Sequence, residues 1–297
     1  MEKTEGFYDL CIPYEQDEKI LQDIVKEALR LGYKTIAIDQ LYDHSKRDVT
    51  KRTPDIFPAP TILKKLEDEF KNQVKILKRL TIIYVDVGIA HAMTNSQNLR
   101  MYNIIAGQPK TDGALTHCCT SFSGDLVTFD METRVKLLVN RKAYQMAVKR
   151  GMFFEIKYGP ATKDYCIRKD MIKLAHNYCV RGKSRNIIFS SGAKNAFELR
   201  GPYDVANLSY IFGLSEDQGK NAVDKSCRQL FLRAESRRTG KTIMTLKASG
   251  PVVFSNISEE EEEMHDYKQR CYDFSTVKDE SESDSLEQPS KKKLKLL

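Results

Sequence analysis

The chain has 297 residues, with 48 lysines and arginines against 41 aspartates and glutamates, and a formal net charge of +7. Its longest apolar runs, such as residues 81–85 and 152–156, are far shorter than the roughly 20 residues of a membrane-spanning helix, and we find no charged leader, so we expect a soluble intracellular protein without a membrane partner. Seven cysteines without a C-x-x-C pair argue against a disulfide framework or a zinc site.

The charge is unevenly distributed along the chain. Residues 251–297 carry 7 basic and 12 acidic side chains, which leaves a balance of +12 on residues 1–250. A basic body with an acidic tail favours a polyanionic partner, although ordinary solvated surface would give the same excess.

Seven short β-like runs recur between segments with helical spacing. They lie at residues 7–12, 35–40, 80–85, 103–106, 125–130, 152–158 and 186–191. An apolar face at Ile20, Leu21, Ile24, Val25, Ala28 and Leu29 predicts a helix that ends at Gly32. Strands that alternate with helices indicate a parallel sheet, and this number of units favours a closed or nearly closed β/α barrel, for which we find no convincing eighth strand.

After Ser191 the predicted alternation of strands and helices gives way to helices. Gly201 and Pro202 predict one helix through Phe212, and Ser215 caps a second that we expect to reach Arg238. We therefore predict a barrel with C-terminal helices over residues 1–250 and a disordered acidic tail over 251–297. The tail ends in a basic cluster, interpreted as a nuclear-import signal, at Lys291, Lys292, Lys293 and Lys295.

The strand ends, where a β/α barrel places its chemistry, are poor in the usual catalytic groups. The five histidines never occur at metal-binding spacing, and the phosphate-loop-like stretch at residues 182–184 lacks its upstream glycine. Asp9, Asp39, Asp86 and Asp130 lie at or near strand ends and could hold a hard cation, but capping of the next helix is the commoner role. Composition and spacing thus support no specific reaction, catalytic residue or metal site.

Basic side chains, in contrast, surround the predicted strands. They could bind RNA phosphates or merely solubilise the surface. The candidate RNA-binding residues are Arg79, Arg100, Lys110, Arg168, Arg181, Lys183, Arg185, Lys194 and Arg200.

One stretch, Glu198–Leu208 together with Phe212–Ser215, resembles the TIM-barrel, thirty-kilodalton protein subunit family of eukaryotic and archaeal ribonuclease P and RNase MRP. Looser matches lie at residues 7–13, 31–38, 76–86, 100–111, 154–164 and 186–193, so the resemblance covers about residues 6–235. It implies a distorted, seven-stranded TIM-like barrel related to the PHP phosphoesterases. Where those enzymes carry two metal-binding histidines after Asp9 and Leu10, this chain has Cys11 and Pro13, and proline offers no ligand.

The resemblance also implies a function. It implies a noncatalytic subunit that binds and stabilises the catalytic RNA in tRNA 5′-leader removal and pre-rRNA processing. Such a subunit binds no cofactor itself, because Mg²⁺ belongs to the RNA. The resemblance also implies that the protein resides in the nucleus, and there in the nucleolus. Its implied partners are the ribonuclease P RNA, the RNase MRP RNA, a small ferredoxin-like protein subunit and the other subunits of the particle.

The resemblance assigns RNA contact to Arg79, Arg100, Lys110, Lys194 and Arg200, whereas the other four basic residues depend on charge and position alone. Four residues of the best-matching segment are structural or partner-contacting candidates, namely Gly201, Pro202, Asp204 and Asn207. Two hypotheses from other classes stay open: a PHP-type metal phosphoesterase that uses Asp9, Asp39, Asp86 and His91, and a scaffold whose basic face binds acidic proteins.

Overall fold

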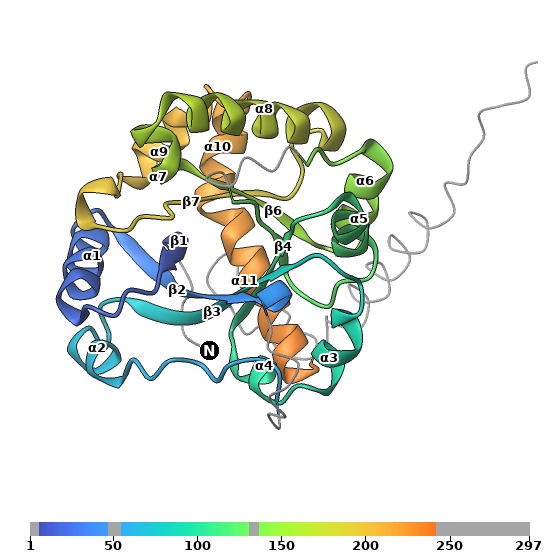
Figure 1. The fold of residues 1–297 in the computed structure, drawn as a ribbon. Helices are drawn as coiled ribbons and strands as arrows, with labels where there is room; N and C mark the ends of the chain where they lie inside the picture. Colours follow the sequence, from blue (N-terminus) through green and yellow to red (C-terminus); the bar gives the residue numbers. More distant parts are fainter. Residues whose placement is uncertain (1–5, 47–54, 131–136, 242–297) are drawn as a thin grey trace, which may run out of the picture. The chain divides into compact units, whose positions relative to one another are not determined.

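The computed structural model describes residues 6–46, 55–130 and 137–241. Seven parallel strands follow one another in chain order within one sheet (Figure 1). They are β1 (Phe7–Pro13), β2 (Tyr33–Asp43), β3 (Lys75–Tyr84), β4 (Ile104–Pro109), β5 (Leu126–Val127), β6 (Phe153–Lys157) and β7 (Ile187–Ser190). The helices are α1 (Glu18–Arg30), α2 (Lys64–Glu69), α3 (Ile89–Asn95), α4 (Asn98–Met101), α5 (Asp112–Thr120), α6 (Arg141–Lys149), α7 (Tyr158–Lys163), α8 (Tyr165–Gly182), α9 (Pro202–Leu208), α10 (Glu216–Val223) and α11 (Lys225–Thr239), with 3₁₀ turns η1 (His44–Lys46) and η2 (Ala196–Glu198).

The elements form where local patterns favour them. Helix α1 starts at Asp17, whose carboxylate accepts a hydrogen bond from the backbone N–H of Lys19, and buries Leu21, Ile24, Val25 and Ala28. It ends before Gly32, whose φ of +95° suits glycine. All seven predicted strands are present, although β5 is only two residues long.

Successive residues of each strand point to opposite faces. In β3, Leu80, Ile82 and Tyr84 pack with the surrounding helices, whereas Leu77 belongs to a separate cluster with residues of the other strands and of α11. The second cluster is the barrel interior. The period-two alternation therefore divides every strand between an outer, helix-covered face and an inner face.

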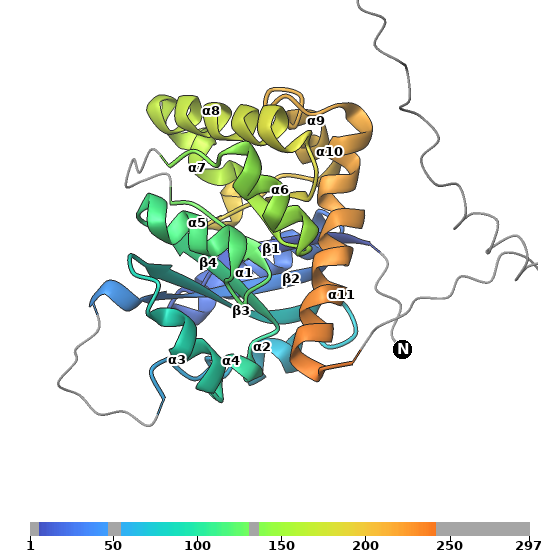
Figure 2. The ribbon, with the colours of Figure 1, turned by 90° about the vertical axis from the view of Figure 1, so that its right-hand side faces the viewer.

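Helix α11 closes the end of the barrel where the strands begin. Its Leu230 and Phe231 pack against Leu77, Phe153 and other apolar side chains of the inner face. Figure 2 shows α11 running across the ends of β1, β2 and β3. The sequence predicted a single helix from residue 215 to Arg238, but the helix breaks at Asp224, which has a non-helical φ of −126° and ψ of −84°.

The barrel is nearly closed, as predicted, within the described residues. The gap between β1 and β7 is bridged after β7, where the Gly192 N–H donates to the carbonyl of Cys11 at 2.8 Å. No described helix is long and apolar enough to span a membrane. The predicted tail and its lysine cluster lie outside the described residues.

Candidate nucleic-acid interface

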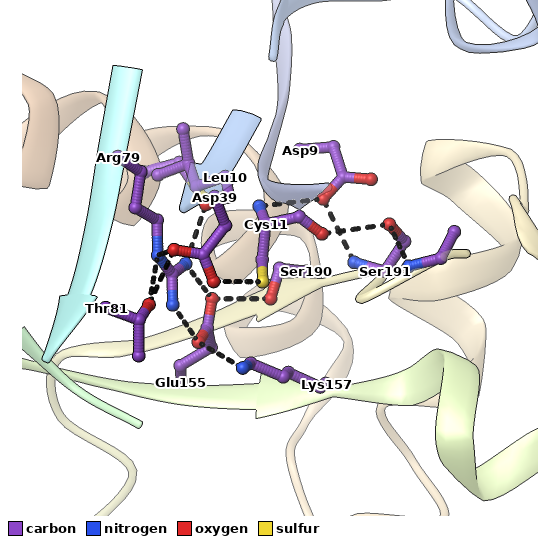
Figure 3. Close-up of polar contacts among 12 residues, drawn as sticks. Asp9, Leu10, Cys11, Asp39, Arg79, Thr81, Glu155, Lys157, Ser190 and Ser191 are labelled. Atoms are coloured by element: carbon purple, nitrogen blue, oxygen red, sulfur yellow. Dashed lines mark hydrogen bonds and ion pairs between the residues drawn. The ribbon is translucent and has the colours of Figure 1, made fainter. Parts of the chain in front are cut away.

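The inner face of the barrel turns polar toward the strand ends. Two residues beyond Leu77 and Phe153, the same strands carry Arg79 and Glu155, and both side chains are completely buried. The Arg79 guanidinium donates two parallel hydrogen bonds to the Glu155 carboxylate, at 2.5 and 2.7 Å, and a third to the carbonyl of Leu10 at 2.6 Å (Figure 3). Burial alone would raise the pKa of Glu155, but the charge and hydrogen bonds of Arg79 outweigh burial and lower it to about 2.

Asp39 occupies the other side of the same guanidinium. Its Oδ1 lies 3.3 Å from Arg79 Nε and accepts a hydrogen bond from the Thr81 hydroxyl at 2.6 Å. Its Oδ2 accepts from the Cys11 thiol at 3.5 Å, and burial raises the pKa of that thiol. Arg79 is thus held between two carboxylates, and the cysteine stays protonated at neutral pH.

Asp9 joins the two edges of the barrel. Its Oδ1 accepts hydrogen bonds from the backbone N–H groups of Ser191, at 3.0 Å, and Cys11, at 3.3 Å. Its Oδ2 is buried without a hydrogen-bond partner. Burial raises the pKa of Asp9 to about 6, against the opposing effect of the Ser191 hydrogen bonds.

The residues of this interior do not fit a metal centre of the phosphoesterase type. Asp39 and Glu155 are committed to Arg79, and Pro13 has no ligand atom. Asp86 and His91, the other residues of that hypothesis, are exposed near the start of α3 and outside the Arg79 cluster. Within residues 6–46, 55–130 and 137–241, no group of three or more histidine, cysteine or acidic side chains is arranged to hold a metal ion.

The assignment of Arg79 to RNA contact is wrong, because its side chain is 0% exposed. The sequence prediction began this strand at Leu80, which put Arg79 in the preceding loop. The strand in fact begins at Lys75, and the alternation from Leu77 through Arg79 to Thr81 directs the guanidinium into the barrel. The available signal was Leu77, two residues before Arg79, which extends the period-two alternation toward the start of the strand.

The other eight candidate residues are not buried, but they do not form one patch. Residues that follow a strand of a β/α barrel lie at the C-terminal end of the strands, and residues that precede a strand lie at the opposite end. Lys110, Arg168 and Lys194 follow strands or begin the next helix, whereas Arg100, Arg181, Lys183 and Arg185 lie shortly before strands. Arg200 lies beside Glu27, Arg30 and Leu31, at the end of α1 that precedes β2. The structure thus divides the predicted RNA-binding set between two ends of the barrel.

Not all of these side chains are equally available. Lys110 is half-buried and donates to Asp43 Oδ2 at 3.0 Å. The Arg168 guanidinium, although exposed, donates to the carbonyl of Ala161 at 2.8 Å. Gly182, next to Lys183, ends α8, and a Cβ there would overlap the ring of Tyr144, so this glycine serves packing rather than a phosphate loop.

Hydrogen bonds and an ion pair hold the segment that carries the family resemblance in place. The Glu198 carboxylate accepts hydrogen bonds from the Lys194 N–H at 3.1 Å and from Lys163 Nζ at 2.7 Å. The backbone of Arg200 is held on both sides, since its carbonyl accepts from the Tyr33 hydroxyl at 2.8 Å and its N–H donates to the Tyr158 hydroxyl at 3.2 Å. The Arg200 side chain projects into solvent from a fixed backbone.

The same loop presents an aromatic residue that the sequence analysis missed. Phe197 is 96% exposed, and it lies between Lys194 and Arg200 in the chain. With Arg200, it lines a groove of about 490 Å³ beside α1. An exposed aromatic ring among cations is the combination that binds unpaired bases, so Phe197 joins the candidate interface.

The four structural candidates behave differently from one another. Gly201 precedes α9 and Pro202 is its buried first residue, so the predicted proline-started helix is confirmed. Asp204 and Asn207 are exposed, and neither side chain forms a hydrogen bond with a described residue. They do not fix the turn, and partner contact by these two residues stays a prediction.

A β/α barrel that pairs its inner Asp39 and Glu155 with its own arginine, and that displays cations and an exposed phenylalanine, defines a binding type of barrel. The family model described as RNase P subunit p30 matches residues 6–239. The chain belongs to this family of ribonuclease P protein subunits.

Individual relatives agree with the family match. The chain is 37% identical over 252 residues to "Ribonuclease P protein subunit p30" of Mus musculus, which covers 83% of this chain and 92% of the relative. It is 26% identical over 262 residues to "Ribonuclease P/MRP protein subunit RPP1" of Saccharomyces cerevisiae, covering 82% and 86%. Among solved structures, a chain of a "cryo-EM structure of archaeal Ribonuclease P with mature tRNA" matches with a TM-score of 0.56 and 13% identity, over 85% of this chain and 100% of that one, which shows a shared fold.

Proposed function

We propose that the chain is a noncatalytic subunit of the nuclear ribonuclease P ribonucleoprotein, in which it binds and stabilises the catalytic RNA during removal of tRNA 5′ leaders. The observation that carries this proposal is the family match over residues 6–239. The Arg79 cluster supports it, because the inner carboxylates of the barrel are already paired. The name of the budding-yeast relative extends the proposal to RNase MRP and pre-rRNA processing.

The remaining roles follow from this assignment. The chain binds no cofactor of its own, and the Mg²⁺ of the reaction belongs to the RNA. Its protein partners are a small ferredoxin-like subunit and the other subunits of the particle. It works in the nucleus and nucleolus, with import directed by Lys291, Lys292, Lys293 and Lys295.

We assign the principal RNA contact to the loop after β7. Arg200 is displayed there from a backbone held by two tyrosine hydroxyls, and Phe197 supplies a ring for stacking. Preorganised cations lose less conformational freedom on binding than cations on a mobile loop. Arg181, in the last turn of α8, and Arg185, which follows α8, provide a second contact.

The test is to recover the tagged protein from its own cells after cross-linking and to sequence the bound RNA. We expect one or two abundant structured RNAs. With the purified RNA, the double variant Arg200→Ala/Lys194→Ala should weaken binding and reduce the salt slope, log Kd against log salt, by about 2, because each lost phosphate contact removes about 1. The double variant Arg181→Ala/Arg185→Ala tests the second contact by the same two measurements, the affinity and the salt slope.

The matched control removes two exposed lysines elsewhere, Lys26→Ala/Lys173→Ala, on α1 and α8. It should leave the affinity and the salt slope nearly unchanged. Recovery of no RNA above background would overturn the proposal. If only the Arg181→Ala/Arg185→Ala variant loses affinity, the assignment to the loop after β7 is wrong and the RNA lies against the turn between α8 and β7.

The import signal has a separate test. Replacing Lys291, Lys292, Lys293 and Lys295 by alanine in the full chain should move a fluorescently tagged protein from the nucleus to the cytoplasm. The control replaces Lys268, Arg270 and Lys278 in the same stretch, which should have no effect. Unchanged nuclear import of the four-lysine variant would contradict this role.

A further inference from the structure

The mouth of the barrel holds a cavity of about 440 Å³ that the family assignment does not explain. All seven strands, or the residues directly after them, contribute to its lining. Its walls include the rings of Tyr14 and Phe129 and the side chain of Leu41, and its floor includes Asp39, Gln108 and Lys157. The volume lies within the range of sites that enclose one small organic group.

One carboxamide in this cavity has hydrogen-bonding capacity to spare. Gln108 is 6% exposed, and its side chain forms no hydrogen bond with any described residue. Gln40, in contrast, points to the outer face of β2, opposite to Asp39, where its Oε1 accepts from the Thr61 N–H and from the Tyr102 hydroxyl. Buried amides are seldom left unpaired, because an unmade hydrogen bond costs about 1–3 kcal/mol.

The charges around the cavity are balanced. At its floor, Arg79 and Lys157 face Asp39 and Glu155, so two cations oppose two carboxylates. Lys194 and Asp130 also line the cavity with opposite charges. A balanced site with a free amide and aromatic residues in its lining favours a neutral, planar group with donors and acceptors on its edge over a metal cation or a free phosphate.

We propose that this cavity binds a single unpaired nucleobase of the RNA that the subunit assembles with, an inference that rests on the proposed function. Gln108 hydrogen-bonds the edge of the base, and Tyr14 or Phe129 packs against its face. Lys194, near the start of the loop after β7, lies next to the phosphate of the inserted nucleotide. The mouth thereby anchors one flipped-out nucleotide while the loop with Arg200 follows the backbone.

The first test blocks the cavity without touching the Arg79 cluster. Leu41 is 61% exposed and lines the cavity, so Leu41→Trp fills the entrance. Gln108→Leu removes the hydrogen-bonding amide. Each variant should weaken RNA binding about 10-fold, the loss expected for one base, and should change the salt slope by at most about 1, because only the Lys194 phosphate contact depends on insertion of the base.

Val180→Trp is the matched control, since Val180 is also exposed but lies on α8 away from the cavity. Thermal unfolding of each variant should stay cooperative, which separates loss of the site from loss of the fold. In the assembled particle, ultraviolet cross-linking should join a peptide with Tyr14 or Phe129 to one nucleotide of the RNA, and Leu41→Trp should abolish this cross-link.

The outcomes separate the two proposals. The base pocket is wrong if Leu41→Trp and Gln108→Leu keep full affinity and an unchanged cross-link while Arg200→Ala/Lys194→Ala loses affinity. That result would leave the proposed function intact. Absence of RNA in the recovered particle overturns both. A third outcome is that adenosine or uridine 5′-monophosphate binds the purified chain, that Leu41→Trp abolishes this binding, and that no cross-link to the RNA forms. In that case the pocket binds a free nucleotide, and the proposal of an RNA base in the pocket is wrong.

Discussion

At the end of the barrel where the strands begin, Leu77 and Phe153 pack against Leu230 of α11 in an apolar plug. Two residues further along the same strands stand Arg79 and Glu155, which are equally buried but charged. The plug is stabilised by apolar area that tolerates imperfect geometry, whereas the ion pair depends on both partners being present. One set of strands therefore carries a structural core at one end and, above the ion-pair cluster, a polar cavity at the other.

Breaking the ion pair should have the largest effect. Arg79→Met leaves Glu155 and Asp39 buried without their cation, so the free energy of unfolding should fall by about 3–5 kcal/mol, measured by urea denaturation. The double variant Arg79→Met/Glu155→Leu should recover much of this loss, because apolar pairs often replace buried ion pairs without cost. Equal stability of Arg79→Met and the wild type would contradict the comparison.

Opening the plug should cost somewhat less. Leu230→Ala removes a fully buried side chain of α11 and should lower the free energy of unfolding by about 2–4 kcal/mol in the same assay. The loss should change little with pH, because Leu230 and the apolar side chains that it packs against carry no charge. A pH-dependent loss would show that the two ends of the interior are coupled.

Asp9 provides a smaller, pH-dependent contrast. Its pKa rises from 3.8 to about 6 on folding, so the folded state binds the proton more tightly, and the resulting stabilisation is present at low pH and lost as the pH rises through 6. The free energy of unfolding of the wild type, relative to Asp9→Asn, should therefore rise on acidification from pH 7 toward pH 4, by at most about 1.4 kcal/mol per pH unit. Glu155, whose pKa falls from 4.5 to about 2 on folding, lowers the stability in the acidic part of this window, but both proteins carry Glu155 and its contribution cancels in the difference. Parallel pH profiles of the two proteins would refute the assignment.

The smallest effect on stability should come from the exposed arginine of the proposed interface. The Arg200 side chain is exposed, so Arg200→Ala should change the free energy of unfolding by less than about 0.5 kcal/mol. A loss comparable to that of Arg79→Met would place Arg200 in the fold rather than in the interface.

The sequence by itself determined the number of strands, their parallel order, the α1 helix and the proline-started helix α9, because these depend on local periodicity and on residues close in the chain. Its resemblance at residues 198–208 also identified the family that the match over residues 6–239 establishes. Tertiary structure decided which way Arg79 points, since that depends on where β3 begins and on Glu155, 76 residues away. It also separated the basic residues onto two ends of the barrel, exposed Phe197 and left Gln108 facing a cavity. These features depend on contacts between residues that are distant in the sequence, and local periodicity carries no information about such contacts.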